Sequence, residues 1–236
     1  KYLKSKKINY LFYNKKKLDI CRYDKLDKIF KKIKPKIIIN CAAFTNVDLA
    51  EENKKKCESI NFFAVKNLIK ISKKYNTFLI HFSTDYIFSG KKGNYNEKDK
   101  ANPINFYGYT KLKAEKIIQN SMDNYLILRI SWLMSKYKNN FLNNIKQKII
   151  NKEAFSMVND QIGNPTLCSS INEFIENFCL KFYSKNILYT GVFHLSNEPQ
   201  ISKYDFSKFI FQSINKDNKK VKYKNYIKPI KSKNFK

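Results

Sequence analysis

Short apolar runs alternate with longer amphipathic stretches along this chain of 236 residues, and that alternation limits the folds open to it. The runs at 36–40, 77–82 and 125–130 predict buried strands, and 8–13 predicts another. Helical spacing of apolar residues predicts helices between these runs. Strands and helices in this order predict an α/β fold with a doubly wound parallel sheet.

The pattern loosens after residue 132. A helix is expected over 139–152, a turn-rich loop over 160–166, and a strand over 191–195 between helices at 169–183 and 203–214. We therefore expect two parts. Residues 1–132 carry the parallel sheet, and residues 133–236 form a smaller α/β portion.

The net charge of +28 first suggests a polyanionic partner such as nucleic acid. However, Arg22 and Arg129 are the only arginines among 47 basic residues, although arginine is the preferred bidentate ligand of phosphates and guanines. The lysines are also spread along the whole chain. This distribution argues against nucleic acid as the partner and favours a solvated basic surface.

Five cysteines without a Cys-x-x-Cys pair indicate a reduced chain in the cytoplasm and no zinc site. His81 and His194 lie in apolar strands and are expected to be core or sheet-face residues, so no metal site is predicted. No apolar run reaches the 18 residues of a membrane span, and no membrane contact is expected.

A phenol and an ammonium four residues apart are a way to make tyrosine a usable acid, because they share one helix face and a cation lowers the phenol pKa. With 16 tyrosines in a lysine-rich chain, roughly three such Tyr-x-x-x-Lys pairs are expected by chance. Five occur: Tyr2/Lys6, Tyr13/Lys17, Tyr107/Lys111, Tyr109/Lys113 and Tyr204/Lys208.

Context selects Tyr107/Lys111. Ligands of such sheets bind at the carboxyl ends of the strands, where Ala42–Thr45, Thr84-Asp85 and Trp132 are predicted to lie. Tyr109/Lys113 is two residues further on, so it faces nearly the opposite side of the helix. The alternatives are an exposed aromatic–lysine pair, a cap made by Thr84, and an ordinary core position for Trp132.

Six blocks stand in a fixed order along most of the chain: Leu18–Ile20, Asn40–Asp48, Ser83–Phe88, Tyr107–Leu112, Arg129–Trp132 and Asp160–Thr166. Together they resemble the dTDP-4-dehydrorhamnose reductases, a family of extended short-chain dehydrogenase/reductases with a Rossmann-like NAD(P)-binding domain. The resemblance makes 1–132 that domain and 133–236 the substrate-binding portion. It implies that NADPH, or NADH, delivers hydride to the C4 ketone of dTDP-4-dehydro-L-rhamnose in dTDP-rhamnose biosynthesis.

The resemblance also implies roles for single residues. Tyr107 looks like the general acid, with Lys111 lowering its pKa and holding the nicotinamide ribose, and Thr84 looks like the hydrogen-bond donor to the carbonyl oxygen. The remaining matches are cofactor positions Asp19, Ile20, Ala42, Ala43 and Thr45, and substrate positions Thr84, Asp85 and Trp132. For Asp19 a cap of the next segment is the alternative.

The chain departs from the family pattern at both ends. The first glycine is Gly90, so the usual first strand and glycine turn are missing, and we expect a chain truncated at the N-terminus and somewhat at the C-terminus. The lysines at 15–17 favour NADPH. A non-catalytic relative, of the type that regulates methionine adenosyltransferase, is the alternative function. A homodimer and a need for Mg²⁺ stay open.

Overall fold

The computed structural model describes residues 9–137, 140–185, 189–216 and 222–234. The chain divides into two compact units, and the first contains residues 1–130 and 176–195. The second contains residues 131–175 and 196–236. Segment 176–195 thus returns to the first unit, whereas the sequence placed the whole of 133–236 in the smaller portion.

Four parallel strands form the sheet of the first unit, in the order β1-β2-β3-β8. They are β1 (Ile37–Asn40), β2 (Phe78–Thr84), β3 (Tyr125–Ile130) and β8 (Gly191–Leu195). The register pairs Asn40 with His81 and Thr84 with Ile130, so the carboxyl ends of β1, β2 and β3 meet at one edge. The predicted α/β class with a parallel sheet is confirmed.

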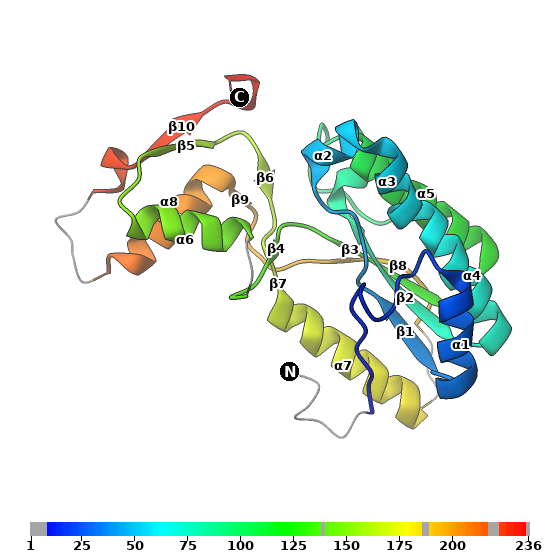
Figure 1. Cartoon of the computed structure of the whole chain (residues 1–236). Coiled ribbons are helices and arrows are strands. Elements are labelled where there is room, and N and C mark those ends of the chain that lie inside the picture. Colours follow the sequence, from blue (N-terminus) through cyan, green and yellow to red (C-terminus); the bar gives the residue numbers. More distant parts are fainter. Residues whose placement is uncertain (1–8, 138–139, 186–188, 217–221, 235–236) are drawn as a thin grey trace. The chain divides into compact units, whose positions relative to one another are not determined.

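Helices cover this sheet (Figure 1). They are α1 (Tyr23–Ile33), α2 (Val47–Glu52), α3 (Lys54–Glu58), α4 (Ala64–Tyr75) and α5 (Phe106–Ser121), with a π-helical turn at Ser59–Phe63 and a 3-10 turn at Asp85–Ile87. Apolar residues of α4 and α5 pack on β2 and β3 and form the main core: Val65, Ile69, Leu79, Ala114, Ile118, Met122 and Ile127. This packing fixes α5 beside the carboxyl ends of the strands.

The helix α7 (Cys168–Lys185) contains residues of both units, because the division falls between Ile175 and Glu176. Within the first unit, Phe178 of α7 contacts Phe78 of β2 with ring centroids 5.4 Å apart. Burying these rings joins the end of α7 to the sheet.

Short strands and two helices make up the rest of the second unit. They are β4 (Leu133–Met134), α6 (Phe141–Ile150), β5 (Phe155–Val158), β6 (Ile162–Gly163), β7 (Thr166–Leu167), β9 (Ile201–Ser202), α8 (Lys203–Ile214) and β10 (Ile227–Ile230), with 3-10 turns at Tyr223–Asn225 and Ser232–Asn234. The strands pair two by two, as β4-β7, β5-β10 and β6-β9. A core of Ile145, Ile149, Met157, Ile210, Phe211 and Ile227 lies between α6, α8 and the β5-β10 pair.

The strand predicted over 8–13 is wrong in its described part. Residues 9–13 are irregular, and the side chains of Leu11 and Phe12 are 63% and 78% exposed. An apolar run becomes a strand only where a neighbour takes up its backbone hydrogen bonds, and residues 9–13 join no strand of the described sheet. Among the described residues, no helix is long and apolar enough to span a bilayer.

Candidate active site

Tyr107 lies in the first turn of α5, next to the end of β2. The side chain of Asn105 caps this helix by accepting a hydrogen bond from the Gly108 backbone N–H at 2.7 Å. A Cβ on Gly108 would come within 2.1 Å of the Tyr86 carbonyl oxygen, so the absence of a side chain lets the helix approach the 3-10 turn. The rings of Tyr107 and Tyr86 pack edge to face, with their centroids 5.9 Å apart.

Thr84 ends β2, and its hydroxyl interacts with the Tyr107 phenol. The same hydroxyl donates to Asp85 Oδ1 at 3.0 Å and accepts the Tyr86 backbone N–H at 3.2 Å. The cap that was the alternative interpretation of Thr84 is therefore present. The same bonds hold the hydroxyl beside the phenol, and the role of Thr84 towards a substrate stays a prediction.

Burial raises the pKa of Tyr107 to about 12, and the hydrogen bond with Thr84 acts in the opposite direction. A depression of this pKa by Lys111 stays a prediction. In the structure the Lys111 Nζ lies 2.5 Å from the Phe82 carbonyl oxygen and 3.2 Å from His81 Nε2.

Lys111 is only 2% exposed. Burial lowers the pKa of this amine to about 8, while Glu115 and Cys57 act in the opposite direction. Lys111 therefore differs from the solvated lysines of the protein surface. Ionisable groups with strongly shifted pKa values are often found at functional sites.

The rival pair Tyr109/Lys113 points elsewhere, as the helix geometry predicts. Tyr109 is 46% exposed, and Lys113 Nζ is bonded to Glu58 Oε1 at 2.5 Å. The Lys113 amine also lies over the Tyr109 ring, 5.5 Å from its centroid. The structure thus brings Tyr107 and not Tyr109 to the strand ends.

The loop after β1 contains Ala42, Ala43 and Thr45, and two asparagines hold its backbone. Asn40 Oδ1 accepts from the Ala42 N–H at 3.1 Å. Asn61 accepts from the Phe44 N–H at 2.8 Å and donates to the Phe44 carbonyl at 3.1 Å. Ala42 and Thr45 remain exposed at the strand edge, where a ligand can reach their backbone.

Sequence reasoning missed Asn61. Its amide also donates to Thr110 Oγ1 at 3.1 Å, and Thr110 in turn donates to the Tyr107 carbonyl at 2.8 Å. Asn61 therefore ties the loop after β1 to α5 from within a π-helical turn, a distortion common at functional sites. An asparagine beside Ile60 and Ala64 on an apolar helix face was the available signal.

Asp19 and Ile20 lie before α1. Asp19 Oδ1 accepts the Cys21 backbone N–H at 2.9 Å, and this bond holds the pKa of the carboxyl below its usual range. Asn67 donates to the Ile20 carbonyl at 3.1 Å. The cap that was the alternative for Asp19 is thus present, and its cofactor role stays a prediction.

Trp132 belongs to the second unit and is half-buried. Its backbone φ is 33°, a left-handed value that is rare outside glycine and asparagine. A Cβ on Gly163 would come within 2.7 Å of the indole ring, and Lys203 Nζ lies 5.7 Å from the ring centroid. The ring is therefore tightly held, and its substrate role stays a prediction.

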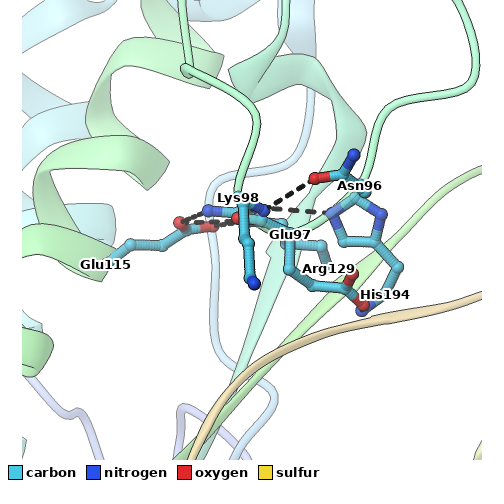
Figure 2. Close-up of polar contacts among 6 residues, drawn as sticks. All are labelled: Asn96, Glu97, Lys98, Glu115, Arg129 and His194. Atoms are coloured by element: carbon cyan, nitrogen blue, oxygen red, sulfur yellow. Dashed lines mark hydrogen bonds and ion pairs between the residues drawn. The ribbon is translucent and has the colours of Figure 1, made fainter.

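One turn beyond Lys111, the Glu115 carboxylate is fully buried against Arg129 of β3. Arg129 Nη2 donates to Glu115 Oε2 at 2.7 Å, and Arg129 Nη1 donates to the Glu97 carbonyl at 3.3 Å. Figure 2 shows Arg129 between Glu115 and His194, whose Nε2 is 3.4 Å from Arg129 Nη1. The sequence analysis missed this pair, although an arginine within an apolar strand was a signal.

Among the described residues, no group of three or more His, Cys, Asp or Glu side chains could hold a metal ion. The parallel sheet and the Tyr107/Lys111 helix at its carboxyl edge define a Rossmann-like protein built as short-chain dehydrogenase/reductases are. Residues 1–236 match the RmlD substrate binding domain family. The chain belongs to that family.

Several relatives similar in sequence to this chain are named dTDP-4-dehydrorhamnose reductase. A dTDP-4-dehydrorhamnose reductase of Aggregatibacter actinomycetemcomitans is 35% identical over 195 residues, covering 82% of this chain and 66% of that protein. The Escherichia coli K12 enzyme of the same name is 32% identical over 187 residues, covering 79% and 62%. The chain thus spans less than two thirds of the length of either relative.

Solved structures agree. A Bacillus anthracis dTDP-4-dehydrorhamnose reductase in complex with NADP superposes with a TM-score of 0.84 at 33% identity, covering 94% of this chain and 75% of that one. A Clostridium acetobutylicum dTDP-4-dehydrorhamnose reductase gives a TM-score of 0.88 at 30% identity, covering 100% of this chain and 79% of that one. The Rossmann-like fold is therefore confirmed.

Proposed function

We propose that this chain reduces the C4 ketone of dTDP-4-dehydro-L-rhamnose to dTDP-L-rhamnose, with NADPH, or NADH as the alternative, as the reductant. One observation carries the proposal: the Thr84 hydroxyl and the Tyr107 phenol meet at the carboxyl edge of the sheet, with the buried Lys111 amine on the next turn of α5. The relatives named dTDP-4-dehydrorhamnose reductase support the substrate.

The residues present fit a dinucleotide. The loop after β1 offers an exposed backbone with small side chains at Ala42 and Ala43, held in shape by Asn40 and Asn61. Lys111 supplies an amine that can hold ribose hydroxyls. We assign Ala42, Ala43, Thr45, Lys111 and, before α1, Asp19 and Ile20 to the cofactor. When bound, the cofactor supplies the hydride.

The chain's own groups manage the proton and the oxygen. Tyr107 donates its phenolic proton to the C4 oxygen, and the Thr84 hydroxyl turns its proton from Asp85 to donate to the same oxygen. A charged Lys111 lowers the Tyr107 pKa from its buried value of about 12 and so makes the phenol a better acid. Asp85 and Trp132 are assigned to the nucleotide-sugar substrate. The cytoplasmic location and a homodimer stay predictions from the sequence.

The test is NADPH oxidation with dTDP-4-dehydrorhamnose, followed by its absorbance, with Tyr107→Phe against Tyr109→Phe as the matched control. Removal of a general acid lowers kcat by about 10²–10⁴. Tyr109 is exposed on the opposite side of α5, so its variant keeps the rate of the unmodified chain.

Equal rates for the two variants would reject Tyr107 as the acid. A folded chain that binds NADPH but leaves the ketone unreduced would reject the reductase proposal and favour the non-catalytic alternative. Binding is read from cofactor fluorescence, which does not depend on turnover.

A further inference from the structure

Three polar side chains form a buried row that runs from β1 through β2 to α5. They are Asn40, His81 and Lys111, which are 5%, 1% and 2% exposed. Asn40 and His81 are register neighbours in the sheet, and His81 lies between the other two. Buried polar groups must satisfy each other's hydrogen bonds, so the proton positions in this row are coupled.

The orientation of the Asn40 amide determines whether His81 Nδ1 carries a proton. The Ala42 backbone N–H can only donate, and it lies 3.1 Å from Asn40 Oδ1. The other end of the amide, Nδ2, therefore faces His81 Nδ1 at 3.1 Å. An amide nitrogen can only donate, so His81 Nδ1 accepts and carries no proton.

The imidazole of His81 is neutral, because burial holds its pKa well below its usual range, and the charged form of Lys111 lowers it further. A neutral imidazole without a proton on Nδ1 carries it on Nε2. His81 Nε2 lies 3.2 Å from Lys111 Nζ. An ammonium group has no lone pair to accept this N–H, whereas a neutral amine has one.

We propose that His81, held in its Nε2–H tautomer by Asn40, is a positioning residue that favours the neutral form of the Lys111 amine over the charged form and turns it towards the end of β2. The amine accepts from His81 Nε2–H and donates to the Phe82 carbonyl at 2.5 Å. Charging Lys111 would force a donor against a donor, unless Asn40 gave up its bond to Ala42.

Other groups near Lys111 act in the opposite direction but do not replace this control. The Glu115 carboxylate on α5 and the Cys57 thiol on α3 both favour the charged amine. Glu115 is already paired with Arg129, which has three hydrogen bonds to its carboxylate. The amine donates to the Phe82 carbonyl in either charge state, so the contact with His81 is the one whose donor and acceptor depend on the charge of Lys111.

The effect of this control on catalysis rests on the proposed function. A charged Lys111 supports Tyr107 as an acid and a neutral one does not, so Asn40 and His81 would set the pH above which reduction slows. Neither side chain needs to touch the ketone for this effect.

The first experiment reads the tautomer directly. The chain has two histidines, so long-range ¹H–¹⁵N NMR of the ¹⁵N-histidine-labelled chain gives two ring patterns, and His194→Asn identifies the second. Above about pH 8, where Lys111 is neutral, we expect the Nε2–H pattern for His81, with ring shifts that change as Lys111 titrates and stay constant in Lys111→Met. An Nδ1–H pattern for His81 at that pH would overturn the proposal.

The second experiment replaces the Asn40 donor that faces His81 Nδ1. Asn40→Asp keeps the shape and the bond to Ala42 but turns the His81 contact from a donor into an acceptor. We expect the Nδ1–H tautomer and a Lys111 titration at least one pH unit higher. An unchanged tautomer would reject the role of Asn40, and the spectrum of the unmodified chain decides the matter if this variant does not fold.

The spectra need neither cofactor nor turnover, so the two proposals fail separately. An inactive chain with the Nε2–H pattern rejects the reductase and keeps the control of Lys111. An active chain with the Nδ1–H pattern rejects the control alone.

Discussion

Lys111 is expected to destabilise the fold at neutral pH, and Lys111→Met measures the effect. The amine is 2% exposed, and burial lowers its pKa from the ordinary 10.5 to about 8. Each pH unit of such a difference corresponds to about 1.4 kcal/mol of stability, so the full difference is roughly 3 kcal/mol. Methionine has a similar length and carries no charge to bury.

The sign follows from proton binding. Between about pH 8 and 10.5 the unfolded chain binds a proton at Lys111 that the folded chain has lost, so the free energy of unfolding rises with pH there. Below about pH 8 both states bind the proton and the full penalty applies. The stability of Lys111→Met relative to the unmodified chain should therefore fall by roughly 2–3 kcal/mol from pH 7 to pH 10.

Urea denaturation followed by far-UV circular dichroism at both pH values gives this difference. The hydrogen bond to the Phe82 carbonyl is lost in the variant at either pH, so it cancels in the comparison. Lys116→Met is the matched control, because Lys116 is exposed on the same helix and its variant should show no such change. A difference for Lys111→Met that is the same at pH 7 and pH 10 would refute the buried, titrating amine.

Three further substitutions test contacts that lie inside one unit or the other. Glu115→Gln leaves the Arg129 cation buried without its partner and should lower the free energy of unfolding by about 3–5 kcal/mol, whereas adding Arg129→Met should recover part of the loss in a double-mutant cycle. Gly108→Ala places a Cβ 2.1 Å from a backbone oxygen and should cost about 1–3 kcal/mol in urea denaturation, although alanine is the better helix former. Gly163→Ala should change the fluorescence of Trp132, the single tryptophan, because the new Cβ lies 2.7 Å from its ring.

Each of these expectations has a clear contrary result. Additive losses for the Glu115 and Arg129 variants would show that the two side chains do not interact. A more stable Gly108→Ala would show that α5 can move away from the 3-10 turn, and Gln119→Ala, exposed later in α5, gives the reference for helix propensity. Unchanged emission from Gly163→Ala would show that the indole ring is not packed on that backbone.

Much of the fold was predictable because burial selects residue types in a regular pattern. The apolar runs at 125–130 and 191–195 are the strands β3 and β8 with the same bounds. The run at 8–13 is also mostly apolar, but its described residues 9–13 form no strand, because a strand also needs a neighbour and the sequence does not say where one lies. Likewise, the return of 176–195 to the first unit depends on the pairing of β8 with β3, which periodicity does not encode.

In the candidate site, too, local features could be predicted from the sequence and long-range contacts could not. Tyr107 could be chosen over Tyr109 because 200° of helix rotation separates them, a local property of the chain. The direction of Lys111 could not be predicted, because its partner His81 is 30 residues away and becomes a neighbour only through the packing of α5 on β2. From the sequence alone His81 is an unspecific core residue, and only the packing shows that its ring lies 3.2 Å from the lysine amine.

This coupling changes how the Tyr-x-x-x-Lys pair should be understood. The spacing alone predicts that Lys111 lowers the Tyr107 pKa, yet the phenol pKa is raised to about 12 while the amine is turned to His81 and Phe82. A lysine with a pKa of about 8 is charged or neutral depending on small changes in its surroundings. If Lys111 is controlled as proposed, the acid strength of Tyr107 depends on Asn40 in β1 and His81 in β2, and substitutions at these two positions should shift the pH profile of the reduction.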